Sequence, residues 1–257
     1  MQNHDRNARR AKYALVGIGL LAGVAVTAGA VAAVSVLGSD DKGATTAKLA
    51  ASASPSNPGG TRKTVTPAKG EPVRLVGATG QRNGISTGFP HTAKGGLSAA
   101  VAFVEELALL DDQKARQQLE AAVSPDAPGY VDERLSEIRT LRESVGLPPS
   151  GGNPAGITFS TNVEAVRVRT LDAEGLPLGD AIHVWMSYDR YATGPDGGPS
   201  DNPLKDEETD VIVKWQSGSW KVTNEPALWK QRTTPVAYFP DSPYAWQDGW
   251  WQVLHAD

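Results

Sequence analysis

A serine between glycines is the first feature of the chain that could carry out chemistry. Gly84, Ser86 and Gly88 match the G-x-S-x-G pattern, in which a strained turn exposes a nucleophilic serine. That chemistry needs a strand before the serine and a helix directly after it. The polar residues 81–83 do not predict a strand, and Pro90 interrupts the entry into the helix that follows. We therefore expect a glycine-rich loop here rather than a catalytic nucleophile.

Four histidines are the next candidates for catalysis or metal binding: His4, His91, His183 and His255. No two of them are three or four residues apart, so the metal-ligand spacing of a helix is absent. We predict His183 on the strand face opposite Ile182, as a surface or pocket-lining residue, with a catalytic base as the alternative. The chain has no cysteine, which excludes thiolate metal sites and thiol catalysis. We expect no cofactor and no bound metal.

Paired carboxylates could perform acid–base work if their surroundings moved their pKa values apart. The chain has such pairs at 105–106 and 111–112, and an acidic cluster at 206–210. The two pairs lie on the surfaces of predicted helices. The cluster lies at the end of a predicted polar loop over 193–208 and continues to Asp210. We therefore expect solvated surface groups at all three places.

Two arginines and a tryptophan could together form a partner surface. Arg167 and Arg169 share one face of a predicted strand, and Trp185 lies on the next strand. Side chains two residues apart point to the same face of a strand, so these three could line a groove for an anionic or protein partner. A strand that simply faces solvent has the same pattern, and that alternative stays open.

The C-terminal section, from residue 226 to 257, is irregular and rich in aromatic residues. Trp246, Trp250 and Trp251 belong to it. So much aromatic area would form a large exposed patch unless it packs against the domain, which is what we expect. The alternative is docking to another protein, to peptidoglycan or to the lipid interface.

The elements that position these residues begin with a membrane anchor. Residues 1–12 form a basic tail, and residues 13–37 contain no charged side chain. A membrane-spanning helix needs about 20 apolar residues, so this run qualifies. Positive charge before it and Asp40 after it predict a cytoplasmic N-terminus and an extracytoplasmic C-terminus at the cell membrane.

Two alternatives concern this same segment. A cleaved signal peptide also has a basic start, although the apolar stretch here is longer than the usual 7–15 residues. Gly19 and Gly23 form a GxxxG pair, which would let two such helices approach closely. In a segment this rich in glycine and alanine the pair can also arise by chance, so the helix-dimer face and the homo-oligomer it implies stay open.

The remainder of the 257 residues divides into a tether and one folded domain. Residues 38–88 are dominated by small and polar residues, which favours a flexible linker because few large apolar side chains could offset the entropy of ordering. The short stretch 72–76 is the exception, since it could join the domain as an added strand. Residues 89–257 hold all seven tryptophans and form the domain.

Periodicity predicts helices first and strands afterwards within the domain. Thr92 is a good N-cap for an apolar stripe at helical spacing. Asp112 is a candidate cap for a second helix, and a further helix is expected over 131–145. After residue 156 the period changes to two, with strands around 166–168 and 182–188 and a hairpin over 211–223. This order is typical of an α+β fold, with helices packed on a curved antiparallel sheet.

The order of tail, membrane span, linker, helices and strands resembles a known family layout. The run VIVKWQSGSWKVTNEP, in which a strand turns into Trp-Lys-Val, resembles the cystatin-like, nuclear-transport-factor-like α+β cone. Membrane-anchored proteins of this kind include TcpC-like conjugal-transfer proteins and type IV secretion assembly factors. The run GFPHTAKGGLSAAVAFVEELALL resembles uncharacterised actinobacterial membrane proteins. The Mce-associated membrane proteins of mycobacteria share the layout, so it does not choose among pathways.

The resemblance implies a non-enzymatic scaffold or assembly component of a conjugative-transfer or secretion apparatus. Its partners would be the membrane and other proteins of that machine. The net charge of −4 is too mild to indicate nucleic acid as the main partner. A ligand-binding or envelope-sensing module is the alternative, because a cone fold encloses a pocket between sheet and helix. A cone-fold enzyme would need a buried histidine or an acid dyad in that pocket.

Overall fold

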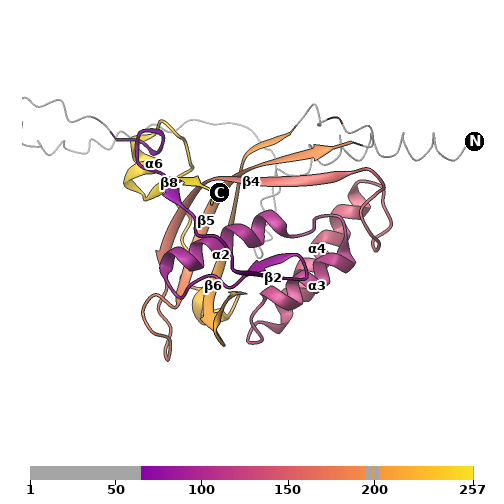
Figure 1. Cartoon of the computed structure of the whole chain (residues 1–257), viewed down its shortest axis with the longest axis horizontal. Coiled ribbons are helices and arrows are strands. Elements are labelled where there is room, and N and C mark those ends of the chain that lie inside the picture. Colours follow the sequence, from indigo (N-terminus) through magenta and orange to yellow (C-terminus); the bar gives the residue numbers. More distant parts are fainter. Residues whose placement is uncertain (1–64, 195–197, 199–202, 257) are drawn as a thin grey trace, which may run out of the picture.

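The sheet at the centre of the domain is long and strongly curled. The computed structural model describes residues 65–194, 198 and 203–256, and within them the chain is α+β (Figure 1). The sheet has the strand order β1-β8-β4-β5-β6-β7, and every neighbouring pair is antiparallel except β1 and β8. Its strands are β1 Val73–Arg74, β4 Thr158–Thr170, β5 Ala181–Thr193, β6 Leu204–Gln216, β7 Ser219–Thr223 and β8 Trp250–Leu254.

Helix α2, Ala93–Glu106, lies along one face of this sheet. The Thr92 hydroxyl caps it by accepting a hydrogen bond from the Gly95 amide (3.0 Å), as the sequence predicts. A Cβ at Gly96 would lie 2.9 Å from the Ile182 side chain and 3.0 Å from Trp220. The glycine therefore lets the helix begin in close contact with the strands.

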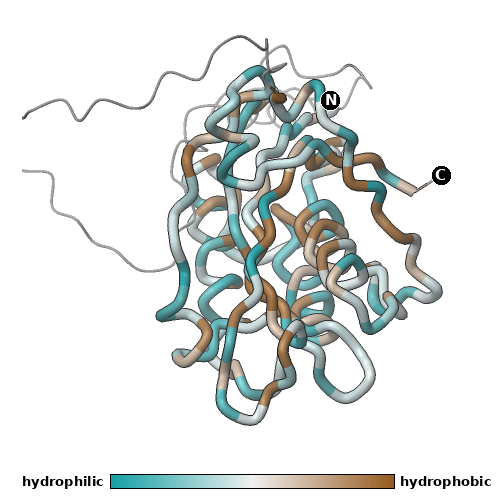
Figure 2. The backbone as a smooth tube through the Cα atoms, turned by 90° about the vertical axis from the view of Figure 1, so that its left-hand side faces the viewer, coloured by the Kyte–Doolittle hydropathy of each residue, from teal (hydrophilic) through white to brown (hydrophobic). Residues whose placement is uncertain are grey.

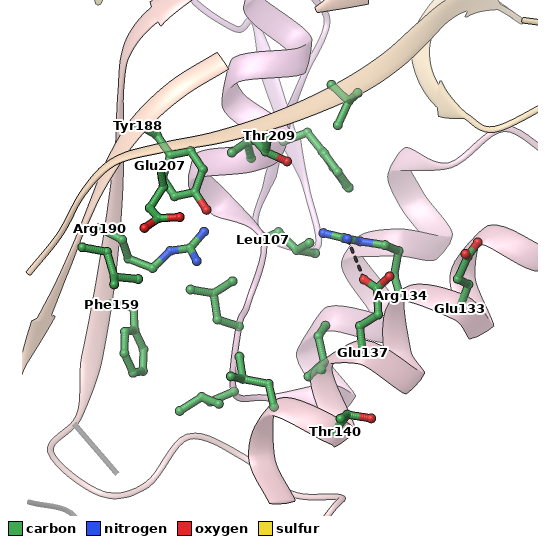
Figure 3. Close-up of a pocket in the computed structure, with 18 of the residues that line it drawn as sticks. Leu107, Glu133, Arg134, Glu137, Thr140, Phe159, Tyr188, Arg190, Glu207 and Thr209 are labelled. Atoms are coloured by element: carbon green, nitrogen blue, oxygen red, sulfur yellow. Dashed lines mark hydrogen bonds and ion pairs between the residues drawn. The ribbon is translucent and has the colours of Figure 1, made fainter. Parts of the chain in front are cut away.

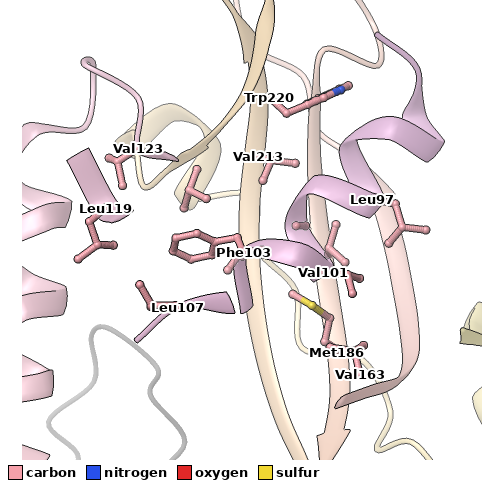
Figure 4. Packing of buried hydrophobic residues seen from close by; sticks show 14 of the residues in the cluster. Leu97, Val101, Phe103, Leu107, Leu119, Val123, Val163, Met186, Val213 and Trp220 are labelled. Atoms are coloured by element: carbon pink, nitrogen blue, oxygen red, sulfur yellow. The ribbon is translucent and has the colours of Figure 1, made fainter. Parts of the chain in front are cut away.

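Two more helices extend the same layer. Helix α3, Asp112–Ala122, is capped by Asp111, one residue earlier than the sequence indicated. Helix α4, Pro128–Ser144, begins three residues before the predicted start at 131, with a proline in its first turn. Apolar side chains from α2 and α3 meet those of β4 to β7 in the main core, where Phe103 and Met186 are almost fully buried (Figure 4).

The opposite face of the sheet is covered by the C-terminal segment, which we define as residues 226–250. It contains the short helices α5, Pro226–Trp229, and α6, Pro243–Gln247, and leads into β8. The central strand β5 therefore has two buried faces, and it is buried at every position from Ala181 to Asp189. Figure 2 shows hydrophobic and hydrophilic stretches alternating along the chain that forms these layers. The expectation that the aromatic tail packs on the domain is confirmed.

The predicted linker over 38–88 extends too far into the domain. The described part of the chain already begins at Val65, and the 3₁₀ helix η1, Pro67–Lys69, lies next to α6, where the Ala68 amide donates to Pro240 O (2.8 Å). Strand β1 pairs with β8, so the stretch 72–76 does add a strand as predicted. The short strands β2, Gly80–Arg82, and β3, Ile85–Thr87, form a separate hairpin.

The predictions for the N-terminal anchor concern residues outside those that the structure describes. These are the basic tail at 1–12, the membrane span at 13–37 and the Gly19–Gly23 pair. Among the residues that the structure describes, no helix is both long and apolar enough to cross a bilayer.

Candidate functional site

The helix-facing stripe of β5 changes from apolar to polar along the strand. Ile182, Val184 and Met186 are fully buried in the main core. The next two residues on that face are Tyr188 and Arg190, since side chains alternate along a strand. The stripe therefore leaves the core and ends in a phenol and a guanidinium.

The neighbouring strand β6 makes the same change at the same level. Val213 and Val211 belong to the core, and the next residues on their face are Thr209 and Glu207. The register pairs Glu207 with Tyr188, so the polar ends of both stripes lie side by side. The prediction of a loop at Glu207 is wrong: β6 begins at Leu204, so Glu207 lies within the strand.

A cavity of about 640 Å³ opens where these polar ends face helix α4 (Figure 3). The end of α2, helix α4 and the adjoining parts of β4, β5 and β6 line it. Its apolar wall includes Leu107, Leu110, Ile138, Leu141, Phe159 and Leu204. Small-molecule sites are typically about 300–1,000 Å³, with apolar walls and a few polar groups, and this cavity has that character.

The Arg190 guanidinium is the least compensated charge of the strand wall. Its Nε donates to Thr161 Oγ1 (3.1 Å), and its centre lies 4.8 Å from the Tyr188 ring. Among the described residues, no carboxylate lies within ion-pair distance of it. Burial lowers the pKa of Arg190, Tyr188 opposes that shift, and the positive charge of Arg134 adds to it.

Helix α4 presents an ion pair from the other side of the cavity. Arg134 Nη1 lies 2.6 Å from Glu137 Oε2. Burial raises the pKa of Glu137; Arg134 opposes the shift, and Glu133 adds to it. Within the described structure the Nε of Arg134 is buried without a hydrogen-bond partner. The pair therefore neutralises most of its own charge but leaves one donor free.

Two further titratable groups complete the polar part of the cavity. Burial raises the pKa of Glu207, and Arg190 opposes that shift. Burial likewise raises the pKa of the Tyr130 phenol, which is 8% exposed. These groups can hold a proton more tightly than they would in water, so the site can offer neutral hydrogen-bond donors beside the guanidinium.

The predicted partner surface on the opposite face is covered by the chain itself. Arg167 donates from Nε to Asp248 O (2.8 Å) and pairs with its carboxylate. Arg169 donates to Thr233 Oγ1 (3.3 Å), and Trp185 donates from Nε1 to Thr233 O (3.0 Å). The structure brings the three residues together, but they bind the C-terminal segment and do not form an open groove.

The tryptophans of the tail have different environments. Trp250 is fully buried, donates from Nε1 to Val236 O (2.9 Å) and packs against Tyr238, so it offers no surface to a partner. Trp246 is half-buried against Gly70, and Trp251 is half-buried on β8. The most exposed aromatic residues of the segment are others: Phe239 and Tyr244.

His183 lies at the centre of a buried charge cluster instead of at the surface. Its Nε2 lies 2.7 Å from Asp210 Oδ2, and Arg232 of the C-terminal segment binds both oxygens of Asp210 at 2.7 Å. Burial alone would raise the pKa of Asp210, but the hydrogen bonds from His183 and Arg232 outweigh it and hold the pKa below its usual value. We call these three residues the latch. Sequence reasoning missed it, because Asp210 was counted with a solvated acidic cluster.

The remaining candidate residues have structural roles. The Ser86 hydroxyl, in the β2–β3 hairpin, donates to Glu106 (2.6 Å). The G-x-S-x-G pattern is therefore not a strained nucleophile turn, and it lies in a hairpin instead of the expected glycine-rich loop. Glu105 accepts from the Val163 amide (2.8 Å), at the bulge of β4. Asp112 is 2% exposed, and hydrogen bonds from the 150–151 turn and an arginine outweigh its burial and lower its pKa. The expectation of solvated acids is wrong at these positions.

Comparisons with known proteins found no relative of this chain. No family model, no curated protein and no solved structure matches the chain. In the described part of the chain, no three histidine or carboxylate side chains are grouped as metal ligands. The cavity and the chemistry of its walls are therefore the features from which a function can be inferred.

Proposed function

We propose that the folded domain is a ligand-binding module that takes up a small amphipathic molecule between α4 and the sheet. The observation that carries this proposal is the cavity of about 640 Å³, in which apolar walls meet a short polar patch. An apolar ligand body gains free energy by leaving water, at roughly 25 cal/mol per Å² of buried area. The polar patch would fix its orientation.

The setting that we propose for this module is the outer side of a cell membrane. The uncharged run 13–37, with basic residues before it and acidic residues after it, supports a single-pass anchor. The curled sheet under one helical layer supports the cystatin-like cone as the fold type. A sensor or carrier of envelope molecules would fit both features.

A thermal-shift screen of the full chain in nanodiscs tests this function. Ligands that bind only the native state raise the unfolding midpoint. The variant Leu141→Trp should fill part of the cavity and abolish the shifts that apolar and amphipathic compounds cause in the wild type. Leu178→Trp, at a loop position that is 80% exposed, should leave the shifts unchanged. Equal shifts in Leu141→Trp, or none in the wild type, would contradict the proposal.

A second candidate function is a scaffold or assembly component of a conjugative-transfer or secretion apparatus. Phe239 and Tyr244 favour it, because they are 63% and 73% exposed on the C-terminal segment. Exposed aromatic side chains are enriched at protein interfaces. Such a component would bind other membrane-machine proteins or a second copy of itself.

Photo-crosslinking in producing cells tests the second candidate. A photoreactive amino acid at Phe239 or Tyr244 should yield the same cross-linked species, and one at Leu178 should not. A chain that stays monomeric and uncross-linked from both aromatic positions would count against a scaffold. This result leaves ligand binding in the cavity unaffected, because the two sites lie on opposite faces of the sheet.

A further inference from the structure

The cavity has an unequal charge balance that indicates which kind of molecule it takes. Two guanidiniums face it, from Arg190 on β5 and Arg134 on α4. Five acidic residues line it, but the carboxylates of Glu208 and Asp210 bind the C-terminal segment and His183 on the other face of the sheet. The carboxylates that remain on the cavity side are those of Glu133, Glu137 and Glu207. The nominal sum is nearly neutral, so the ligand's charge follows from how each group is already compensated.

The charges of α4 are largely satisfied within the helix. Arg134 and Glu137 form an ion pair at 2.6 Å, three residues apart on one helical face. Glu133 is exposed at the rim, where water solvates it. A ligand that displaces water from the cavity would leave this wall close to neutral.

The two charges of the strand wall respond differently to a ligand that expels water. Glu207 can take up a proton when it is desolvated, and its pKa is already raised by burial. Arg190 cannot lose its charge in this way, because a guanidinium stays protonated in proteins. Its hydrogen bond to Thr161 uses one of five N–H donors. The group that a bound ligand must compensate is therefore Arg190.

We propose, on the basis of the ligand-binding function above, that the cavity takes a single-chain organic carboxylate whose head group pairs with Arg190. A planar carboxylate can accept two parallel hydrogen bonds from a guanidinium, and such charge-assisted bonds are roughly twice as strong as bonds between neutral groups. The chain would lie along Leu107, Leu141 and Phe159, on the apolar side of the cavity. Tyr188 holds the guanidinium in place through its ring.

Three probes that share one chain and differ in head group test this inference: decanoate, decanol and decylammonium. We would measure apparent Kd by thermal shift on the full chain in phosphatidylcholine nanodiscs, with protein-free nanodiscs as the partition blank. Decanoate should bind about tenfold tighter than decanol or better, because hydrogen bonds to a charged group add about 1.5–3 kcal/mol. Decylammonium should bind no tighter than decanol.

Arg190→Gln should remove the preference for decanoate and keep the binding of decanol, which also shows that the variant is folded. Arg190→Lys should restore part of the preference, because lysine keeps the positive charge but lacks the planar pair of donors that binds both carboxylate oxygens. Arg116→Gln, on the exposed surface of α3, is the matched control and should behave as wild type. A preference for decanoate that survives in Arg190→Gln would overturn the inference, and so would a preference for decylammonium.

The same experiment separates this inference from the function on which it depends. If decanol and decanoate bind equally to the wild type, and Leu141→Trp abolishes both, the cavity binds ligands but the carboxylate is not recognised. If none of the three probes shifts the midpoint of the wild type, the ligand-binding function itself fails.

Discussion

The two faces of the central sheet are built from the same strands, and both bury apolar side chains, but within the described structure a buried charge cluster lies on only one of them. On the helix face, Val211 and Val213 of β6 join an apolar core that gives way to a polar-ended cavity. On the other face, Asp210 of the same strand fixes the C-terminal segment through His183 and Arg232. The helix face is packed but leaves room for a ligand, whereas the other face is closed by charge pairs and by two small apolar clusters around Trp250 and Leu228. Alternation along one strand is enough to produce both.

Removing the latch should have the largest effect on stability. Asp210→Ala leaves His183 and Arg232 without their buried partner, and breaking a buried pair in this way costs about 3–5 kcal/mol. Chemical unfolding of the full chain would measure the loss. Asp132→Ala, at a side chain that is 80% exposed, should change stability by no more than about 0.5 kcal/mol. An equal loss in the two variants would mean that the second face is not held by this cluster.

Substitution of two leucines of α4 should destabilise the protein to different extents, because one leucine is packed in the core and the other lines the cavity. Leu135 is 1% exposed in the core, so Leu135→Ala should cost about 2–5 kcal/mol. Leu141 is half-buried and lines the cavity, so Leu141→Ala should cost about 1 kcal/mol. Similar losses at both positions would show that α4 is packed along its whole length and that the cavity is filled.

A smaller effect should follow from the hydrogen bond that joins Trp185 to Thr233. Trp185→Phe keeps an aromatic ring against the C-terminal segment but removes the Nε1 donor, so the main-chain oxygen of Thr233 loses that hydrogen bond. The expected loss is about 0.5–1.5 kcal/mol. Amide exchange over residues 226–250 should become faster, and exchange in β6 should stay unchanged. Unchanged exchange over 226–250 would show that the segment is held without this hydrogen bond.

The smallest expected effect is a difference between the two faces in how their carboxylates make stability depend on pH. The pKa of Asp210 is lowered, so its contribution to stability is present above about pH 3.9 and is lost as the pH falls through its folded pKa. The pKa of Glu207 is raised, so its ionised form costs stability at neutral pH. Glu207→Gln should therefore be slightly more stable than wild type at pH 7, within about 0.5 kcal/mol. That advantage should disappear near pH 4, and an advantage that grows with acid would contradict the assignment.

Local signals in the sequence predicted much of the fold. The Thr92 cap, the helical stripe after it and the hairpin over 211–223 were all confirmed. These features depend on neighbouring residues, so a single sequence carries them. The end of the linker was misplaced because β1 is stabilised by a strand about 180 residues further along the chain, which no local pattern reveals.

The candidate site was harder to predict for a related physical reason. Tyr188 and Arg190 continue the alternating stripe of β5, and Thr209 and Glu207 continue that of β6, so extending both periods would have placed a polar patch inside. The charged start of β6 looked like a loop instead. The latch depends on three residues from separate elements. Its histidine was predicted to lie at the surface or in a pocket, because the segment that covers that face is irregular and carries no periodic signal.

The central claim is that a small molecule binds between α4 and the polar ends of β5 and β6. Its most direct test is photo-crosslinking of the full chain in membranes with a decanoate that carries a diazirine on its chain, followed by mass spectrometry of the labelled peptides. We predict labels on residues 128–144 and on the strand around Phe159, and excess decanoate should suppress them. Labels confined to the C-terminal segment, or labels that excess decanoate does not reduce, would contradict the account.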